Sequence, residues 1–538
     1  MQKWYPLLLG LFVVRLLGVA DAFAQLPASA KLDAGAAAAC TRLALITSEG
    51  NTSITSATLE TSGSLRVNAE MTLTNLPPFC RVQGVSRPSS DSDIRFEVWL
   101  PTAANWNRKF LSSGEGGFVG SLNYTRNGLD GGLDELVRRG YATASTDTGH
   151  RASDNWWAVG HPERVTDYLH RGKHLVTVAA KRVIATYYGA PPVRSYLNSC
   201  SNGGRQALME AQRYPDDFDG IVAGAPWNFQ SHSNAGFIWN AQALSAKGTA
   251  LPAEKLPAIA AAAVTACDAK DGLKDGVIAD PPSCQFDPAV LACKGAENNE
   301  CLTAPQIAAV KKIYGGPKNP RTGEQIFPGF AIGSEAGWTG MLAARLGMGY
   351  FGNLTFENPQ WDFRTFDFDA DMAAADAKIG RQGNAVSVDY SAAKARGVKI
   401  IQYHGWDDQT LQPGFSPEYY EKVAAANGGH ASTQDFYRLY MVPGMTHCYF
   451  GTSASSFGGV GQQLPPTRDV DHDIQLALER WVENGVPPAT LIATKYTDDL
   501  PGTRTVKLTR PLCLYPTIPR YNGTGDPNDH ASFSCVAR

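Results

Sequence analysis

Short apolar runs of strand length alternate with segments of helical spacing along the first 228 residues, and the alternation returns near the end of the chain. Strands that alternate with helices are typical of α/β proteins with a mostly parallel sheet. We expect strands at 93–101, 109–118, 140–150, 194–200, 218–226, 397–408 and 435–448, and helices at 171–189, 203–215 and 470–485.

The alternation stops between residues 229 and 396. This stretch is rich in Ala, Gly, Asp and Pro and contains four of the cysteines. Its position between two parts of one α/β pattern indicates an insertion. We therefore predict a core formed by 25–228 and 397–538, with 229–396 as an inserted domain.

The first residues have the pattern of a secretory signal peptide. Lys3 supplies a positive charge, residues 6–14 are apolar, and 22–24 form a small-x-small cleavage site. Arg15 interrupts the apolar run, which argues against a membrane-spanning helix. An N-terminal core helix is the alternative. We predict that 1–24 are a signal peptide and that the mature protein is secreted or periplasmic.

Charge and composition exclude some functional classes. The 538 residues carry a net charge of −3, and no long run of one sign is present. Nucleic-acid-binding proteins usually show a basic face, so that class is disfavoured. The hydrophobic fraction of 43% is ordinary for a globular protein. We expect no nucleic-acid partner and no membrane span.

The ten cysteines indicate disulfide bonds if the protein is exported, because an even number in an oxidising compartment is typical of paired cysteines. The sequence alone does not set their connectivity. Pairing of nearest neighbours would join Cys40 to Cys80, Cys267 to Cys284, Cys293 to Cys301 and Cys513 to Cys535, which leaves Cys200 and Cys448.

A serine lies between the expected strand 194–200 and the expected helix 203–215. A nucleophile elbow needs a sharp strand-to-helix turn, with small residues two positions before and two after the serine. Around Ser201 these positions hold Ser199 and Gly203, so the first glycine of the usual pattern is missing. A helix N-cap is the alternative role for Ser201.

The order of residues further along the chain favours the nucleophile. α/β hydrolases place serine, acid and histidine in that order. An acid ends the expected strand 397–408, at Asp407 or Asp408, and His447 follows the next expected strand. Ser201 would attack an acyl carbon and His447 would accept its proton. The carboxylate would orient the imidazole and stabilise its charged form.

An acyl-transfer site also needs two backbone N–H donors for the oxyanion. One should come from Asn202, directly after the nucleophile. The other should come from the loop after an early strand, where Gly116 is the first candidate and Gly117 the second. Glycine lets the backbone approach the substrate closely. A plain tight turn is the alternative for this loop.

Several segments together resemble the tannase and feruloyl esterase family of α/β hydrolases, which also includes terephthalate monoester hydrolases. They are CSNGGRQALMEAQRYPDDFDGIVAGAP, YHGWDD, PGMTHC, STDTGH and a Cys-rich Asp-Gly loop at 267–284. The resemblance covers nearly all of the mature chain. It implies an α/β-hydrolase core, a large inserted lid domain at 229–396 and serine-esterase activity.

The resemblance also ranks the candidate acids and histidines. The family pattern His-Gly-x-x-Asp falls on Asp408, with Asp407 as the alternative acid. His404 is expected to be a structural histidine of the loop. His150 matches a family position, but no role follows from its surroundings in the sequence.

A disulfide between Cys200 and Cys448 is a further implication of the resemblance. The Cα atoms of bonded cysteines lie about 5.5–6 Å apart. Such a bond would therefore keep Ser201 and His447 close together. The rival interpretation makes Cys200 a free thiol nucleophile paired with His447.

An acidic loop between Cys267 and Cys284 is a candidate metal site. Calcium binds six to eight carboxylate and carbonyl oxygens. The spacing of the acids differs from that of an EF-hand, and a solvated Asp-Gly turn explains it equally well. The resemblance implies a structural calcium ion held by Asp268, Asp271, Asp275 and the carbonyls of Leu273 and Val277.

The resemblance implies small-molecule substrates that are esters of aromatic acids. Trp361 is our candidate for stacking on the acyl ring, with an ordinary core tryptophan as the alternative. No arginine of the insertion is marked by its spacing as a carboxylate clamp. We therefore rank feruloyl-type esters first, with tannase or terephthalate monoester hydrolase activity as alternatives. An exported binding protein with a dead site and a secreted peptidase are the other classes to test.

Overall fold

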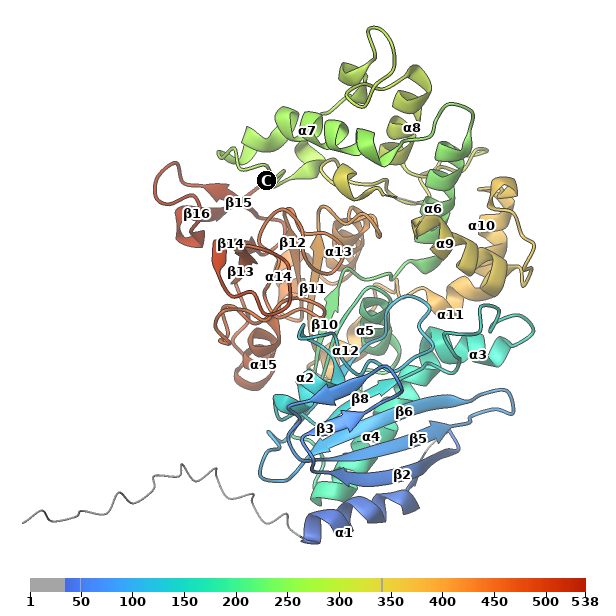
Figure 1. Cartoon of the computed structure of the whole chain (residues 1–538), viewed down its shortest axis with the longest axis vertical. Coiled ribbons are helices and arrows are strands. Elements are labelled where there is room, and N and C mark those ends of the chain that lie inside the picture. Colours follow the sequence, from blue (N-terminus) through green and yellow to red (C-terminus); the bar gives the residue numbers. More distant parts are fainter. Residues whose placement is uncertain (1–33, 49, 340–341) are drawn as a thin grey trace, which may run out of the picture.

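A computed structural model describes residues 34–48, 50–339 and 342–538 (Figure 1). The predicted signal peptide at 1–24 lies outside the described residues. No helix among the described residues is long and apolar enough to cross a membrane.

The core is a sheet with an antiparallel half and a parallel half. The antiparallel half has the order β1 (Thr47–Ser48), β2 (Thr52–Glu60), β5 (Phe79–Ser86), β6 (Ile94–Pro101), β8 (Thr143–Thr146). The parallel half has the order β7 (Lys109–Ser113), β9 (Arg194–Cys200), β10 (Gly220–Gly224), β11 (Lys399–Gly405), β12 (Tyr437–Val442). Parallel pairing of Phe110 with Ala142 joins the two halves.

The prediction of a mostly parallel sheet is therefore wrong for half of the sheet. β5 and β6 are joined by a short connection and pair antiparallel, from Phe79 opposite Pro101 to Ser86 opposite Ile94. A short connection cannot form the crossover that parallel neighbours require. β2 escaped prediction because its sequence, TSITSATLE, has few apolar residues.

Helices pack on the sheet where the sequence pattern expects them. α4 (Gly172–Tyr188) packs on β6 and β8, and α5 (Asn202–Arg213) packs on β9 and β10. α15 (Ile474–Asn484) packs on β10 and β11. Two small hairpins complete the C-terminal part: β13 (Thr490–Tyr496) with β14 (Val506–Cys513), and β15 (Ile518–Tyr521) with β16 (Phe533–Val536).

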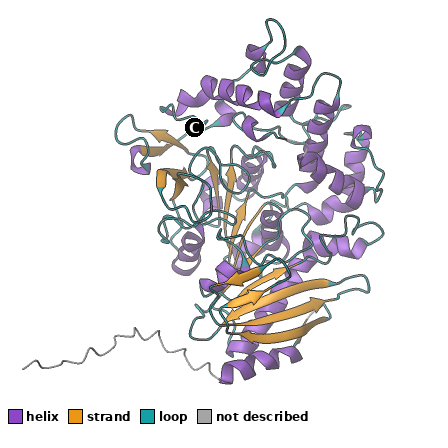
Figure 2. Ribbon diagram, in the orientation of Figure 1, coloured by secondary structure: helices purple, strands orange, loops and turns teal. Residues whose placement is uncertain are grey.

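The segment 229–396 is mainly helical and follows the end of β10. Figures 1 and 2 show its first helices above the parallel strands. It has its own buried aromatic residues, among them Tyr350, Phe351 and Phe366. Its helices are α6 (Gln230–Ser245), α7 (Leu256–Cys267), α8 (Ala304–Gly315), α9 (Leu342–Met348), α10 (Ala370–Ala375), α11 (Arg381–Gly383) and α12 (Ser391–Ala395).

All ten cysteines form disulfide bonds, as the sequence predicts. The pair Cys200–Cys448 has a Cα–Cα distance of 6.0 Å and spans 248 positions of the chain. The other bonds are Cys40–Cys80, Cys267–Cys284, Cys293–Cys301 and Cys513–Cys535.

Candidate active site

Ser201 occupies a strained turn between β9 and α5. Its backbone φ is 66° and its ψ is −126°, a conformation that non-glycine residues rarely adopt. The N–H of Ser201 donates to the carbonyl of Gly224 at 2.9 Å, and the N–H of Trp227 donates to the carbonyl of Ser201 at 3.0 Å. The chain at the end of β10 and just after it therefore holds the turn in its strained conformation. This fixes the position of the Ser201 hydroxyl.

The packing around the turn explains the unusual serine at position 199. A Cβ added to Gly203 would lie 1.8 Å from Ser199 Oγ, and one added to Gly114 would lie 2.1 Å from the same atom. Ser199 thus fits because two glycines leave room for its side chain. A Cβ on Gly204 would lie 2.4 Å from the carbonyl oxygen of Gly224. Close contact of helix and strand requires these glycines.

The predicted serine, histidine and acid form a continuous chain of hydrogen bonds. Ser201 Oγ lies 2.9 Å from His447 Nε2, and His447 Nδ1 lies 2.7 Å from Asp408 Oδ2. Because the carboxylate accepts the proton on Nδ1, Nε2 is left to accept the hydroxyl proton of Ser201. Asp408 follows β11 and His447 follows β12, at the same edge of the sheet as Ser201.

The surroundings of Asp408 keep it ionised. Burial alone would raise the pKa of this carboxyl, but hydrogen bonds from His447 and His404 hold the pKa well below its ordinary value. The other carboxylate oxygen accepts the N–H groups of Thr410 and Leu411, each at 2.8 Å. His404 is therefore a structural neighbour of the acid, with its Nε2 3.0 Å from Asp408 Oδ2.

Asp407 has a different environment. Burial and the nearby Glu335 raise its pKa well above the ordinary value. Among the described residues, Asp407 Oδ1 has no hydrogen-bond partner, and no hydrogen bond joins Asp407 to His447. The structure therefore brings Asp408, and not Asp407, to the histidine.

The predicted oxyanion donors are the N–H groups of Gly116, on the loop after β7, and of Asn202, directly after Ser201. The N–H groups of Gly116 and Asn202 have no hydrogen-bond partner within the described chain. Asn202 is the first residue of α5, where N–H groups are free of helical bonds. A Cβ added to Gly116 would contact nothing within 4 Å, so open space faces this part of the loop. Gly117 has a φ of +58°, and its carbonyl accepts the Tyr168 hydroxyl at 3.2 Å.

The disulfide between Cys200 and Cys448 joins the immediate neighbours of Ser201 and His447. It excludes a free thiol at Cys200 and with it the cysteine-nucleophile alternative. The Cys448 carbonyl also accepts the side-chain amide of Gln462 at 3.1 Å. Ser201 and His447 are thus held together by the disulfide between their neighbours as well as by their own hydrogen bond.

Comparison with known proteins shows the family of the chain. The family model described as tannase and feruloyl esterase matches residues 80–536. The chain belongs to the tannase and feruloyl esterase family. It is therefore a carboxylic ester hydrolase that acts on small-molecule esters.

The relatives of this esterase agree with that conclusion. An uncharacterized esterase of Xanthomonas campestris pv. campestris is 41% identical over 94% of this chain and 92% of its own. A mono(2-hydroxyethyl) terephthalate hydrolase of Piscinibacter sakaiensis is 32% identical over 86% of this chain and 85% of its own. The crystal structure of feruloyl esterase B from Aspergillus oryzae has a TM-score of 0.85 and 28% identity, covering 93% of this chain and 100% of its own.

A cavity of about 430 Å³ lies between the core of the esterase and its inserted segment. Phe118 lines it and also packs on Trp227, which binds the nucleophile turn. His150 lines it as well, stacked on Trp157 with ring centroids 3.9 Å apart. Burial lowers the pKa of His150 to about 4, so its Nε2–H donates to the Phe118 carbonyl at 2.5 Å from a neutral ring. Sequence reasoning missed the cavity because distant segments form it.

Trp361 lies elsewhere in the inserted segment. Its ring packs with Phe351, Phe356 and Phe366, at centroid distances of 5.8, 5.6 and 6.1 Å. It is not among the described residues that line the cavity. Ser201 and His447 are not among the described lining residues either, so the role of Trp361 at the substrate stays a prediction.

The acidic loop brings its carboxylates close enough to interact. Burial, together with repulsion from Asp275 and Asp268, raises the pKa of Asp271 to about 6. The carbonyls of Leu273 and Val277 accept no hydrogen bond within the described chain. Such an all-oxygen set suits a hard cation such as calcium. Arg510 offsets one charge, with its Nη2 2.7 Å from Asp275 Oδ2.

A second group of possible metal ligands lies on α4, on α5 and just after α5. His174, Glu210 and Asp217 have ligand atoms within 4.8 Å of one another. His174 Nδ1 already lies 2.6 Å from Asp217 Oδ2. Burial and the nearby Asp217 raise the pKa of Glu210 well above its ordinary value, which disfavours the carboxylate form that a metal ligand needs. The cluster has no contact with the triad.

Proposed function

We propose that this esterase is a secreted serine hydrolase that cleaves esters of aromatic carboxylic acids through an acyl-enzyme. The hydrogen-bonded chain from Ser201 through His447 to Asp408 at a strained turn carries the proposal. Such a chain activates a hydroxyl that is a weak nucleophile on its own.

In the first half of the reaction, Ser201 Oγ attacks the ester carbonyl carbon and His447 Nε2 takes the hydroxyl proton. The N–H groups of Gly116 and Asn202 stabilise the negative oxygen of the tetrahedral intermediate. As the intermediate collapses, His447 gives that proton to the leaving alkoxide and the alcohol departs.

In the second half, a water molecule loses its proton to His447 and its oxygen attacks the acyl carbon. The new tetrahedral intermediate expels Ser201 Oγ, which recovers the proton from His447. Asp408 stays ionised throughout and stabilises the charged imidazole in both halves.

Feruloyl-type esters are our first choice of substrate, in line with the relative feruloyl esterase B. The aromatic residues Phe118 and Trp157 of the cavity can pack on an aryl ring. One observation favours terephthalate monoesters as a second candidate, because Arg345 also lines the cavity and could pair with a free carboxylate. The inserted segment 229–396 would then act as a lid over the substrate.

Export and calcium complete the proposal. Five disulfides suit an oxidising compartment, which supports the predicted signal peptide. Asp268, Asp271 and Asp275 would hold a structural calcium ion with the carbonyls of Leu273 and Val277, and the ion would supply positive charge to the loop. The ion would take no part in the reaction.

A hydrolysis panel tests the substrate assignment. Purified esterase is given methyl ferulate, methyl gallate, a terephthalate monoester and a peptide amide, with Ser201→Ala as the control. We expect the highest kcat/KM on methyl ferulate and no turnover by Ser201→Ala. Turnover of any of these esters by Ser201→Ala would contradict the serine mechanism. Preference for the peptide amide would favour a peptidase, and absence of any turnover would favour a binding protein.

A further inference from the structure

The loop that carries Gly116 is held by a buried ion pair that the triad does not use. Glu115, directly before Gly116, is 2% exposed, and so is Lys173 of α4. Lys173 Nζ lies 3.6 Å from Glu115 Oε1. Burying two charges costs free energy even when they are paired, so fold stability alone is a weak reason for such a pair.

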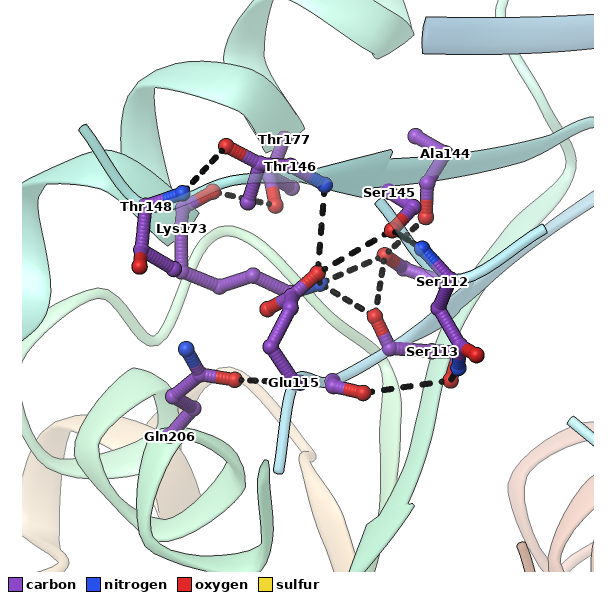
Figure 3. A network of polar contacts seen from close by, with 12 residues as sticks. Ser112, Ser113, Glu115, Ala144, Ser145, Thr146, Thr148, Lys173, Thr177 and Gln206 are labelled. Atoms are coloured by element: carbon purple, nitrogen blue, oxygen red, sulfur yellow. Dashed lines mark hydrogen bonds and ion pairs between the residues drawn. The ribbon is translucent and has the colours of Figure 1, made fainter. Parts of the chain in front are cut away.

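Lys173 joins α4 to the end of β7, as Figure 3 shows. Its Nζ donates to Ser112 Oγ at 2.9 Å and to the Ser113 carbonyl at 2.5 Å. Glu115 Oε1 accepts the N–H of Thr146, on β8, at 3.2 Å. The pair therefore ties the start of the loop to one helix and two strands.

Two side chains of α5 hold the main chain of Glu115 from the opposite side. Gln206 Oε1 accepts the N–H of Glu115 at 3.0 Å. Asn202 Nδ2 donates to the carbonyl of Glu115 at 3.1 Å. Arg205 Nε donates to Asn202 Oδ1 at 2.8 Å, which turns the amide nitrogen of Asn202 toward Glu115. We name as the oxyanion-loop clamp the side chains of Glu115, Lys173, Asn202 and Gln206.

The carbonyl of Glu115 and the N–H of Gly116 belong to one planar trans peptide, so they point in opposite directions. When Asn202 holds that carbonyl, it also sets the direction of the Gly116 N–H. We propose that the oxyanion-loop clamp is a set of positioning residues that aims the Gly116 N–H at the oxyanion. This inference rests on the proposed function, in which Gly116 and Asn202 donate to that oxygen.

The test removes one part of the clamp from each side of the loop. Asn202→Ala deletes the bond to the Glu115 carbonyl but keeps the backbone N–H, and Lys173→Met deletes the buried cation. A misplaced donor costs about a hundredfold in rate. We therefore expect kcat on methyl ferulate to fall about a hundredfold, with KM within about twofold of wild type. Affinity for phenylboronic acid, whose boron forms a tetrahedral adduct with the serine oxygen, should fall in parallel.

Lys255→Met is the matched control, because Lys255 is also buried, 3% exposed, and pairs with Glu297 at 3.0 Å in the inserted segment. It should lower the melting temperature and leave kcat and boronic-acid affinity unchanged. Folded clamp variants with wild-type kcat would overturn the proposal. A rise in KM as large as the fall in kcat would also overturn it.

The test also has a fallback and a separate check of the mechanism. If Asn202→Ala does not fold, Gln206→Met replaces it, because it removes the acceptor of the Glu115 N–H. Wild-type kcat in folded Gln206→Met would then overturn the proposal. Turnover by Ser201→Ala would instead overturn the proposed function, so the two failures are distinguishable.

Discussion

At the scale of single residues, the pKa values of two adjacent aspartates after β11 are shifted in opposite directions because their surroundings differ. Asp408 is surrounded by donors, and its histidine partners hold its pKa well below the ordinary value against the effect of burial. Asp407 is buried beside the acid Glu335, which is also buried, so its pKa is raised well above the ordinary value. Burial therefore favours the protonated form of Asp407, whereas its histidine partners favour the ionised form of Asp408.

This difference predicts opposite results for two similar substitutions. Asp408→Asn should lower kcat by about 10⁴, because the amide cannot hold His447 in the working tautomer or stabilise its charge. Asp407 makes no hydrogen bond to His447, and Asn has nearly the same shape as Asp, so Asp407→Asn should change kcat only a few-fold. Both variants are assayed on a chromogenic aryl ester after circular dichroism shows that they fold. The reverse order of losses would move the catalytic acid to Asp407.

His150 predicts a dependence of stability on pH. Its pKa is about 4 in the folded protein because it is buried against Trp157, and about 6.5 in an unfolded chain. The unfolded state therefore binds more protons between these values, and stability falls as the pH drops from 6.5 to 4. The full effect is about 3 kcal/mol.

The free energy of unfolding in urea at pH 7.5 and pH 4.5 measures this effect. We expect His150→Asn to lose less stability between the two pH values than wild type. His170, whose pKa is also lowered to about 4 by burial, should add a second decrement, so His150→Asn/His170→Asn should be flatter still. If both variants keep the pH dependence of wild type, the pKa values of these rings are not lowered in the folded protein.

At the scale of elements, the disulfide between Cys200 and Cys448 links the last residue of β9 to the loop after β12. We expect Cys200→Ala/Cys448→Ala to lose about a hundredfold in kcat at temperatures where it is folded, because a shift of about 1 Å between base and nucleophile has that cost. The control is Cys513→Ala/Cys535→Ala, which removes the bond between β14 and β16. It should lower the melting temperature and keep kcat. Full activity in both variants would make the first bond only a stabilising cross-link.

Sequence patterns predicted the strands that precede the candidate catalytic residues. Ser201, Asp408 and His447 each follow a strand with a clear apolar run, so their residue types and order sufficed. The Thr-rich strand β2 has too few apolar residues to show a pattern. The cavity could not be predicted, because Phe118, His150 and Arg345 meet only through the packing of distant segments. The contact of Trp361 with the substrate stays a prediction; its ring packs with Phe351 and Phe366.

At the scale of the whole molecule, the acidic loop joins the inserted segment to the C-terminal hairpins. Arg510 of β14 reaches Asp275 at 2.7 Å and lies over the ring of Phe533, on β16. A small cavity between the loop and these hairpins is lined by Asp271 and Asp275. A cation bound here would hold together two regions that the chain connects only through the core.

We therefore predict that chelation lowers the melting temperature without affecting the chemistry. A ligand that binds only the folded state stabilises it by about 2.7 kcal/mol at a hundredfold excess over its Kd. EDTA should lower the melting temperature by a few degrees, and calcium should restore it, while kcat measured well below the transition stays the same. Asp268→Asn/Asp271→Asn should abolish the difference, and Glu300→Gln, an exposed acid of the same segment, should keep it. If EDTA leaves the melting temperature of wild type unchanged and the purified protein contains no calcium, the loop is a solvated turn whose negative charge is offset in part by Arg510.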